Sequence, residues 1–547
     1  MYFSKNNAGD DTIPQNTIEE VIGAVKLRIE QLVYGANLSN DPKEDGIAIA
    51  KLHQALHDCG LGGDRERVYV KEYIKEILSE GLKLEEEQLD KLISFEKPSK
   101  LTDLDRFEIL LYIYSEAYGA DGLSKMFDNI NEDFLQNRHE VDRETLKSLW
   151  DLGSRKLSFL EKLDIITQRV YEELYGFSVC DMLISGDTAV DSVSAGCGGS
   201  LSCKGIGKSK IGMGHEVIYI MLHGRKIRLS FLGFASENAL ERVVKKLGRN
   251  HPRVQLSRKN SYLVTGLRNN ARVVVTRPPI SEGWTFYVRK FNTSPPGDLE
   301  GLLSGKAASL VISLLRMLVG GCQNLVITGE QASGKTTLLK RLVGFIDKGY
   351  SIRVAEQAFE LRLNELYPDR NIHALQEYGD STVEDAITLF KKTDTDVTIC
   401  GEINEPEAAE ALIQVCQSGG RFTMCTSHHQ TSDKLVDYMR NALLKHSGIH
   451  NEAVATSQVL DAIHFDVHLQ MDVDGQRKIA RITELWDDNG KLKKQDILKF
   501  EQDSYQFCGK IYQAHADEIR RAYPAWCKEE AACIMPAGEE EWLSTSI

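Results

Sequence analysis

The chain has 547 residues, of which 42% are hydrophobic and 27% charged, and its net charge is −14 at pH 7. At roughly 100–200 residues per domain this length predicts three or four domains, and the ordinary composition excludes a wholly disordered chain. The most apolar stretch, residues 307–322, contains Arg316 and is shorter than the ~20 apolar residues that span a bilayer. We therefore expect no transmembrane helix. The first residues lack the pattern of a secretory signal, which predicts a cytoplasmic protein.

Cysteine usage agrees with a reducing compartment. The 11 cysteines are an odd number, scattered without CxxC pairs, which indicates thiols rather than a disulfide framework. Cys197 and Cys203 flank a loop rich in Gly and Ser, but no second pair of ligands accompanies them. We interpret them as loop cysteines rather than zinc ligands.

Residues 1–150 are predicted to form a helical region. Apolar residues recur at helical spacing from the start, as in Ile18, Val21, Val25 and Ile29. An acidic helix is expected over residues 80–92. Residues 151–205 continue as a helical segment followed by a Gly/Ser linker. Nothing in this part resembles a catalytic constellation, so it is expected to pack or to bind a partner.

Residues 206–292 are predicted to form a small α+β domain. Short β-rich runs cover residues 217–222, 226–232, 272–276 and 284–291, with a helix expected over 237–247. Residues 204–272 carry 15 Lys and Arg against three acids. Such a basic segment attracts nucleic acid, an anionic membrane or nucleotide phosphates, or is only a solvated face, and charge alone does not choose between these. The segment Asn292-Thr-Ser-Pro-Pro-Gly297 reads as a linker.

Residues 300–470 alternate between helix and strand. Helices are expected over 305–318, from 335, and over 382–392, 405–417 and 432–445, with strands over 324–328, 351–355, 396–400 and 421–426. This alternation predicts an α/β domain with a mostly parallel sheet covered on both faces. Ser381 and Glu384 suggest a capping box. Residues 471–547 are expected to hold a hairpin and a tail, with strands over 462–471 and 478–486 turning at Asp474-Gly475.

A phosphate-binding loop is the strongest motif in the chain. Gly329-Glu-Gln-Ala-Ser-Gly-Lys-Thr-Thr337 fits G-x-x-x-x-G-K-[ST] and lies between an expected strand and an expected helix. Such a loop surrounds phosphates with backbone N–H groups, while its lysine reaches the β- and γ-phosphates and its first threonine binds Mg²⁺. The expected ligands of ATP are Gly329, Ala332, Ser333, Gly334, Lys335, Thr336 and Thr337, and the expected ligand of Mg²⁺ is Thr336.

Carboxylates that could orient an attacking water follow two other strands. Glu356 comes directly after residues 351–355, and Glu402 follows 396–400 with Gly401 between. Ligands of such sheets gather at the carboxyl ends of strands, which favours both residues as catalytic. His428 ends the next strand and is either a sensor of the γ-phosphate or a simple hydrogen-bonding residue.

In order and spacing, these motifs resemble the secretion ATPase superfamily, the hexameric motors of type II and type IV secretion and pilus assembly, and most of all its tight-adherence pilus type. The likeness covers roughly residues 155–490. It includes Tyr171-Glu-Glu-Leu-Tyr-Gly-Phe177, Tyr287-Val-Arg-Lys-Phe291, the phosphate loop, an acidic box at Ala355-Glu-Gln-Ala-Phe-Glu-Leu361, a Walker B position at Cys400-Gly-Glu-Ile403 and a histidine box at Thr426-Ser-His428.

This resemblance implies a RecA-like P-loop ATPase domain preceded by a PAS-like domain. It places Glu356 in the acidic box, makes Glu402 the Walker B glutamate, and gives Arg289, with Arg272 as second choice, the role of adding positive charge at bound nucleotide. It also implies a homohexamer at the inner face of the cell membrane, where ATP hydrolysis drives pilin or substrate movement through a membrane platform protein. No stable nucleic acid is expected.

Four positions depart from the family pattern. Gln357 stands where the acidic box usually has Asp, Asn404 where Arg often follows the Walker B glutamate, and Lys391-Lys392 where arginine is common. Losing such charges removes transition-state stabilisation. A nucleotide-gated scaffold with little hydrolysis is therefore an alternative to a motor, and the basic segment leaves a nucleic-acid motor as a third.

Overall fold

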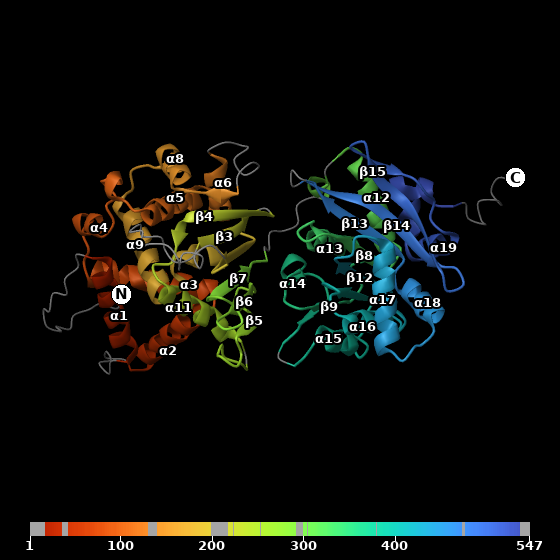
Figure 1. The fold of residues 1–547 in the computed structure, drawn as a ribbon, viewed down its shortest axis with the longest axis horizontal. Helices are drawn as coiled ribbons and strands as arrows, with labels where there is room; N and C mark the ends of the chain where they lie inside the picture. The colour runs from red at the N-terminus through yellow and green to blue at the C-terminus, as the bar shows by residue number, and fades with distance from the viewer. Residues whose placement is uncertain are drawn as a thin grey trace. The chain divides into compact units, whose positions relative to one another are not determined.

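The computed structural model describes residues 17–34, 42–129, 139–186, 188–197, 217–222, 224–251, 253–291, 299–303, 305–378, 380–472 and 476–536. Contacts divide the chain into two units, Met1–Asn292 and Thr293–Ile547. Figure 1 draws the elements of both units along the chain. None of the described helices combines the length and the apolar character that crossing a bilayer demands. Cys203, the segment 292–297 and the turn at Asp474-Gly475 lie outside the described residues.

The first unit begins with helices packed around one apolar core, which includes Val25, Ile74 and Val170. The main helices are α1 (Ile18–Tyr34), α2 (Pro42–Cys59), α3 (Asp64–Glu76), α5 (Asp103–Tyr118), α6 (Gly122–Asp128), α8 (Arg143–Gly153) and α9 (Phe159–Leu174). The prediction of a single helix over residues 80–92 is wrong. A π-helical turn at Ile77–Gly81 ends before α4 (Glu86–Leu92) begins, because Lys83 between them has a positive φ of 51°.

A mostly antiparallel sheet completes this unit. Its strand order is β1-β4-β3-β2-β7-β6-β5, and helix α11 (Glu237–Leu247) contacts β6 and β7. The strands are β1 (Glu140–Val141), β2 (Ser192–Ala195), β3 (Val217–Leu222), β4 (Arg225–Gly233), β5 (Tyr262–Gly266), β6 (Arg272–Thr276) and β7 (Thr285–Arg289). The sequence reading missed β1, β2 and β5. It took Ser192 onward as linker, but β2 pairs with β3 and β7 and buries Val193 and Ala195 completely.

The second unit is built on one mixed sheet with the order β10-β9-β11-β12-β8-β13-β14-β15-β16. Pairing is parallel from β10 to β13 and antiparallel from β13 to β16. The strands are β8 (Leu325–Gly329), β9 (Ile352–Glu356), β10 (Ile372–Gln376), β11 (Val397–Cys400), β12 (Phe422–Ser427), β13 (Phe465–Met471), β14 (Arg477–Asp487), β15 (Leu492–Glu501) and β16 (Ser504–Phe507). The fold is therefore mixed α/β.

Helices cover both faces of the parallel part of this sheet. On one face lie α12 (Ala308–Gly320), α13 (Lys335–Leu342) and α19 (Gln513–Ala522), and on the other α15 (Val383–Phe390), α16 (Pro406–Cys416), α17 (Ser432–His446) and α18 (Glu452–Ala462). Successive side chains of β8 point to opposite faces of the sheet. Val326 packs in the core with α15 to α18, and Ile327 packs in the core with α12, α13 and α19. The capping box of α15 is one residue later than expected, with Thr382 as N-cap and Asp385 at the third position.

A buried carboxylate fixes β13 beside β8. Asp466 is fully buried and accepts hydrogen bonds from the hydroxyl of Thr328, from Ser432 Oγ at 2.7 Å and from Arg481 Nη2 at 3.2 Å. Because a carboxylate only accepts, the Thr328 hydroxyl donates to it and in turn accepts from Nδ1 of His468 at 2.8 Å. The strand that leads into the phosphate loop is thereby held to α17 and β14.

We expect Asp466→Ala to lower the free energy of unfolding of the second unit by about 3 to 5 kcal/mol, because it leaves the Arg481 guanidinium without its buried partner. Thermal unfolding followed by circular dichroism measures the effect. Asp472→Ala is the matched control, since the Asp472 carboxylate, which pairs with Lys478 at 2.8 Å, is 41% exposed and such a pair is worth about 1 kcal/mol or less. An equal loss in both variants would contradict the account.

Candidate functional site

The phosphate loop joins the buried end of β8 to the start of α13. Gly329, Ala332 and Gly334 all have positive φ, of 144°, 66° and 98°. A Cβ at Gly329 would lie 2.4 Å from the carbonyl oxygen of Leu469, so only glycine fits there. This backbone turns the N–H groups at the start of α13 toward a common point, which is an arrangement that binds anions.

Lys335, the first residue of α13, is buried and held by three acceptors. Its ammonium donates to the carbonyl oxygens of Gly329 and Glu330, both at 2.9 Å, and to Nδ1 of His428 at 3.1 Å. These three partners are two carbonyl oxygens and an imidazole nitrogen, which carry no formal charge. A phosphate in the loop would offer this charge a stronger, ionic partner.

His428 links Lys335 to Glu402. Its Nε2 is paired with Oε1 of Glu402, while Nδ1 accepts from Lys335. Since an ammonium can only donate and a carboxylate can only accept, this geometry assigns the neutral ring with hydrogen on Nε2. The structure therefore brings together Lys335, Glu402 and His428, which the sequence reading singled out separately, as one hydrogen-bonded chain.

The acidic box contributes two carboxylates with different surroundings. Glu360 Oε1 accepts a hydrogen bond from the Thr336 hydroxyl at 3.0 Å. Glu356 is buried and accepts from the Leu361 backbone N–H at 2.7 Å, while its Oε1 has no hydrogen-bond partner among the described residues. Burial, together with the neighbouring charge of Glu360, raises the pKa of Glu356 to about 8.

Other residues of the loop also suit a phosphate. The Ser333 side chain is almost fully buried, and its hydroxyl has no hydrogen-bond partner in the described part of the chain. An orphaned buried donor beside Gly329 is what an added phosphate oxygen would satisfy. Thr337 lies in the first turn of α13, and Thr336 is the hydroxyl that would reach Mg²⁺. The described residues show no group of three His, Cys, Asp or Glu side chains able to hold a metal by themselves.

The two arginines expected at the nucleotide lie in the other unit. Arg272 and Arg289 are register partners on the neighbouring strands β6 and β7. The Arg289 guanidinium stands 5.8 Å from the ring centre of Phe291. The structure thus places these two arginines side by side on adjacent strands of the first unit.

Sequence reasoning missed three contributors to the site. Glu360 stands within the quoted acidic box but was given no role, although its spacing of four from Glu356 could have suggested one. Asp466 and His468 were missed because they lie on a strand assigned to a hairpin, where alternating polar residues carry no sign of a buried network.

Comparison with known proteins bears on this site. The family model described as type II/IV secretion system protein matches residues 260–463. No curated protein matches the chain. Among solved structures, the VirB11 ATPase of the Brucella suis type IV secretion system, determined with sulphate, is 18% identical, with 54% of this chain and 89% of that chain covered and a TM-score of 0.29.

Two further structures are similar at the same level. The Legionella pneumophila ATPase DotB is 14% identical, with 57% of this chain and 78% of that chain covered and a TM-score of 0.37. The pilus retraction motor PilT, determined with bound ADP, is 13% identical, with 68% and 90% covered and a TM-score of 0.38. Residues 260–463, which hold the phosphate loop, Glu402 and His428, are therefore the part of this chain that resembles the type II/IV secretion system protein family.

Proposed function

We propose that this chain is an ATP-hydrolysing motor that powers pilus assembly or protein secretion through a membrane platform protein. In this proposal the second unit holds a RecA-like P-loop ATPase domain, and the sheet of the first unit is a PAS-like domain. The motor acts as a cytoplasmic homohexamer, peripheral at the inner face of the membrane. The match of residues 260–463 to the type II/IV secretion system protein family supports the secretion context.

The observation that carries the proposal is the hydrogen-bonded chain from Lys335 through His428 to Glu402, next to a loop with three positive φ values. In this arrangement the phosphates of ATP replace the carbonyl partners of Lys335. His428 then reports the presence of phosphate to Glu402, because the two share one imidazole ring. Phosphoryl transfer needs little covalent chemistry from the protein, so positioning and charge supply most of the catalysis.

Each residue then has a definite task. Lys335 neutralises the β- and γ-phosphates, and the Thr336 hydroxyl holds Mg²⁺, which supplies further positive charge to the phosphates. Glu402 orients the attacking water. Glu356, kept protonated by burial, holds the acidic box in place through Leu361. Arg289, or Arg272 in its place, supplies positive charge to nucleotide bound in its own or a neighbouring subunit.

A nucleotide-gated scaffold is the second candidate. Gln357 and Asn404 remove charges that the family pattern usually provides, which favours slow hydrolysis or hydrolysis that waits for a partner. A nucleic-acid motor has less support, because aromatic residues are sparse in the basic segment 204–272.

Steady-state phosphate release with Mg²⁺-ATP distinguishes the first two candidates. We expect the purified wild-type protein to turn over repeatedly, and Lys335→Ala to fall to background, because the loop loses its only lysine. Arg341→Ala, which removes a positive charge from the same helix, is the control. Wild-type release no faster than that of Lys335→Ala, despite measurable ATP binding, would favour the scaffold.

Glu402→Gln separates binding from chemistry. It should keep ATP affinity within about threefold, since the amide can still accept from His428, and it should reduce turnover by roughly a hundredfold or more, because the carboxylate no longer orients water. Fluorescent-nucleotide titration and phosphate release measure the two effects. Unchanged turnover would exclude Glu402 from the reaction.

Glu356→Gln tests the buried acid through pH. The folded-state pKa of about 8 exceeds the ordinary value of 4.5. Below the ordinary value both states are protonated and the carboxyl costs nothing; as pH rises toward 8 the unfolded state gains stability by ionising. The variant cannot ionise, so its melting temperature should exceed that of the wild type by a margin that grows from pH 5 to pH 8.

The control for this prediction is Glu365→Gln, which changes an exposed carboxylate paired with Arg362. Its melting temperature should differ from that of the wild type by the same small amount at every pH. A margin for Glu356→Gln that stays constant or shrinks with pH would show that Glu356 is ionised in the folded protein.

A further inference from the structure

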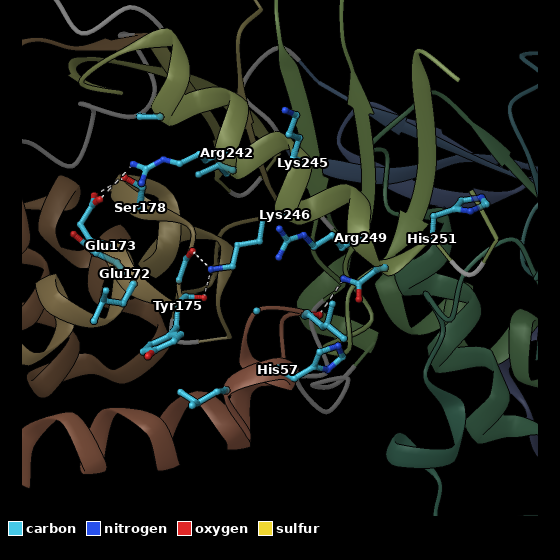
Figure 2. A pocket seen from close by; sticks show the side chains of 18 residues that line it. His57, Glu172, Glu173, Tyr175, Ser178, Arg242, Lys245, Lys246, Arg249 and His251 are labelled. Carbon is cyan, nitrogen blue, oxygen red and sulfur yellow. Dashed lines mark hydrogen bonds and ion pairs between the residues drawn. The ribbon is translucent and has the colours of Figure 1, made fainter. Parts of the chain in front are cut away.

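A second polar pocket, separate from the phosphate loop, lies within the first unit. Its volume is about 680 Å³, within the range of small-molecule sites. It is formed where the ends of α2 and α9 meet α11 and the 3₁₀ turn Gly248–Asn250. Figure 2 shows this pocket with its lining side chains.

One face of α11 makes the pocket basic. Arg242, Lys246 and Arg249 follow a spacing of four and seven residues, so they share one side of the helix and its 3₁₀ extension, and Lys245 also lines the pocket. Lys245 is already paired with Glu241 at 2.6 Å and points away from the other three in Figure 2. The charges that remain at the pocket are those of Arg242, Lys246 and Arg249.

These three charges have little anionic compensation. Arg249 makes no hydrogen bond or ion pair with any residue that the structure describes. Lys246 donates to the backbone carbonyls of Tyr175 and Gly176, at 2.7 Å for Gly176, rather than to a carboxylate. Arg242 has only a distant pair, 3.8 Å from Glu173.

The acids that line the pocket do not change this balance. Glu173 is also bound by the Ser178 hydroxyl at 2.8 Å. Glu172 is almost fully buried, and burial raises its pKa well above the ordinary value, with the neighbouring Glu108 raising it further. Its carboxyl group is already paired with Nε of Arg169 at 3.6 Å. One carboxylate thus faces three cations.

The neighbouring cations also affect Lys246. Burial, with a smaller contribution from the charges of Arg249 and Arg242, lowers the pKa of Lys246 to about 8, although the charge of Asp181 opposes this lowering. Positive charges held close together repel one another, and a bound anion would relieve that repulsion.

A histidine from the opposite wall is oriented toward the same space. Nδ1 of His57 lies 2.9 Å from Oδ1 of the buried Asp58, which also accepts from Gln54 and Arg268, each at 2.8 Å. Since the carboxylate only accepts, Nδ1 carries the hydrogen, and Nε2 is the ring atom left for a ligand. Aliphatic side chains complete the walls, namely Leu56, Leu61, Leu174 and Val243.

We propose that this pocket binds a small organic polyphosphate, with Arg242, Lys246 and Arg249 contacting its phosphates and the aliphatic walls contacting its organic part. Arginine guanidinium groups match phosphate oxygens in pairs, and three cations suit more than one phosphate. A membrane surface fits less well, because the cations line a concavity rather than a convex apolar face. Single-stranded nucleic acid would need a row of aromatic rings, and Tyr175 is the sole Phe, Tyr or Trp among the lining residues described.

The test uses the full chain carrying Lys335→Ala, which silences the phosphate loop and makes the outcome independent of the proposed ATPase activity. Isothermal titration calorimetry without Mg²⁺ uses pyrophosphate and ADP as probes. We expect saturable binding of both, tighter for ADP if the organic part contributes. Adding Arg242→Ala with Arg249→Ala should weaken binding by roughly tenfold or more, because two charge-assisted contacts are lost.

Lys226→Ala with Arg258→Ala is the charge-matched control, since both residues are exposed in the same unit and neither lines the pocket. Equal weakening in the control would overturn the proposal, as would the absence of saturable binding of either probe. Binding of pyrophosphate but not of ADP would also overturn the organic part of it. Sedimentation with phosphatidylglycerol vesicles that depends on Arg242 and Arg249, without binding of the probes, would show a membrane surface instead.

Discussion

The candidate site depends on how the charge of Lys335 is held. Two backbone carbonyls and one imidazole nitrogen accept hydrogen bonds from a buried ammonium, and the carboxylate of Glu402 is linked to it through His428. Such a charge is solvated well enough to keep the loop folded, yet its partners are weaker than a phosphate. In the proposed function, nucleotide binding therefore affects Glu402, because Lys335 and Glu402 contact the two nitrogens of the same ring.

The sheet of the second unit makes this arrangement possible. Strands β8, β11 and β12 run parallel, so their carboxyl ends meet at one edge and bring the loop, Glu402 and His428 together. Helices on both faces bury every residue of β8, so a ligand could contact this part of the chain only at the loop that follows the strand. The buried Asp466 then ties β13 and α17 to the same strand, so the site rests on a rigid element.

The site was predictable where a local motif carries the chemistry, and it was not where residues distant in sequence meet. The glycines and Lys335 follow from one nine-residue pattern, since positive φ and a helix N-terminus are local properties. The contact of Glu360 with Thr336 joins residues 24 positions apart, and no periodicity signals it. Strand β10 (Ile372–Gln376) was missed because, as an edge strand, it lacks an apolar run. Strand β2 was missed because its residues are small and do not form the apolar pattern expected of a buried strand. In the first unit, the sequence showed an excess of positive charge, but only the structure shows which three cations share a pocket.

The most direct test of this account is a structure of the protein with Mg²⁺ and a slowly hydrolysed ATP analogue. The account predicts that Lys335 Nζ leaves the carbonyl oxygens of Gly329 and Glu330 for the phosphates, that Thr336 exchanges Glu360 for Mg²⁺, and that the pairing of His428 with Glu402 changes. Nucleotide bound at the loop with Lys335 still on both carbonyls and on His428, or no nucleotide at the loop, would contradict it.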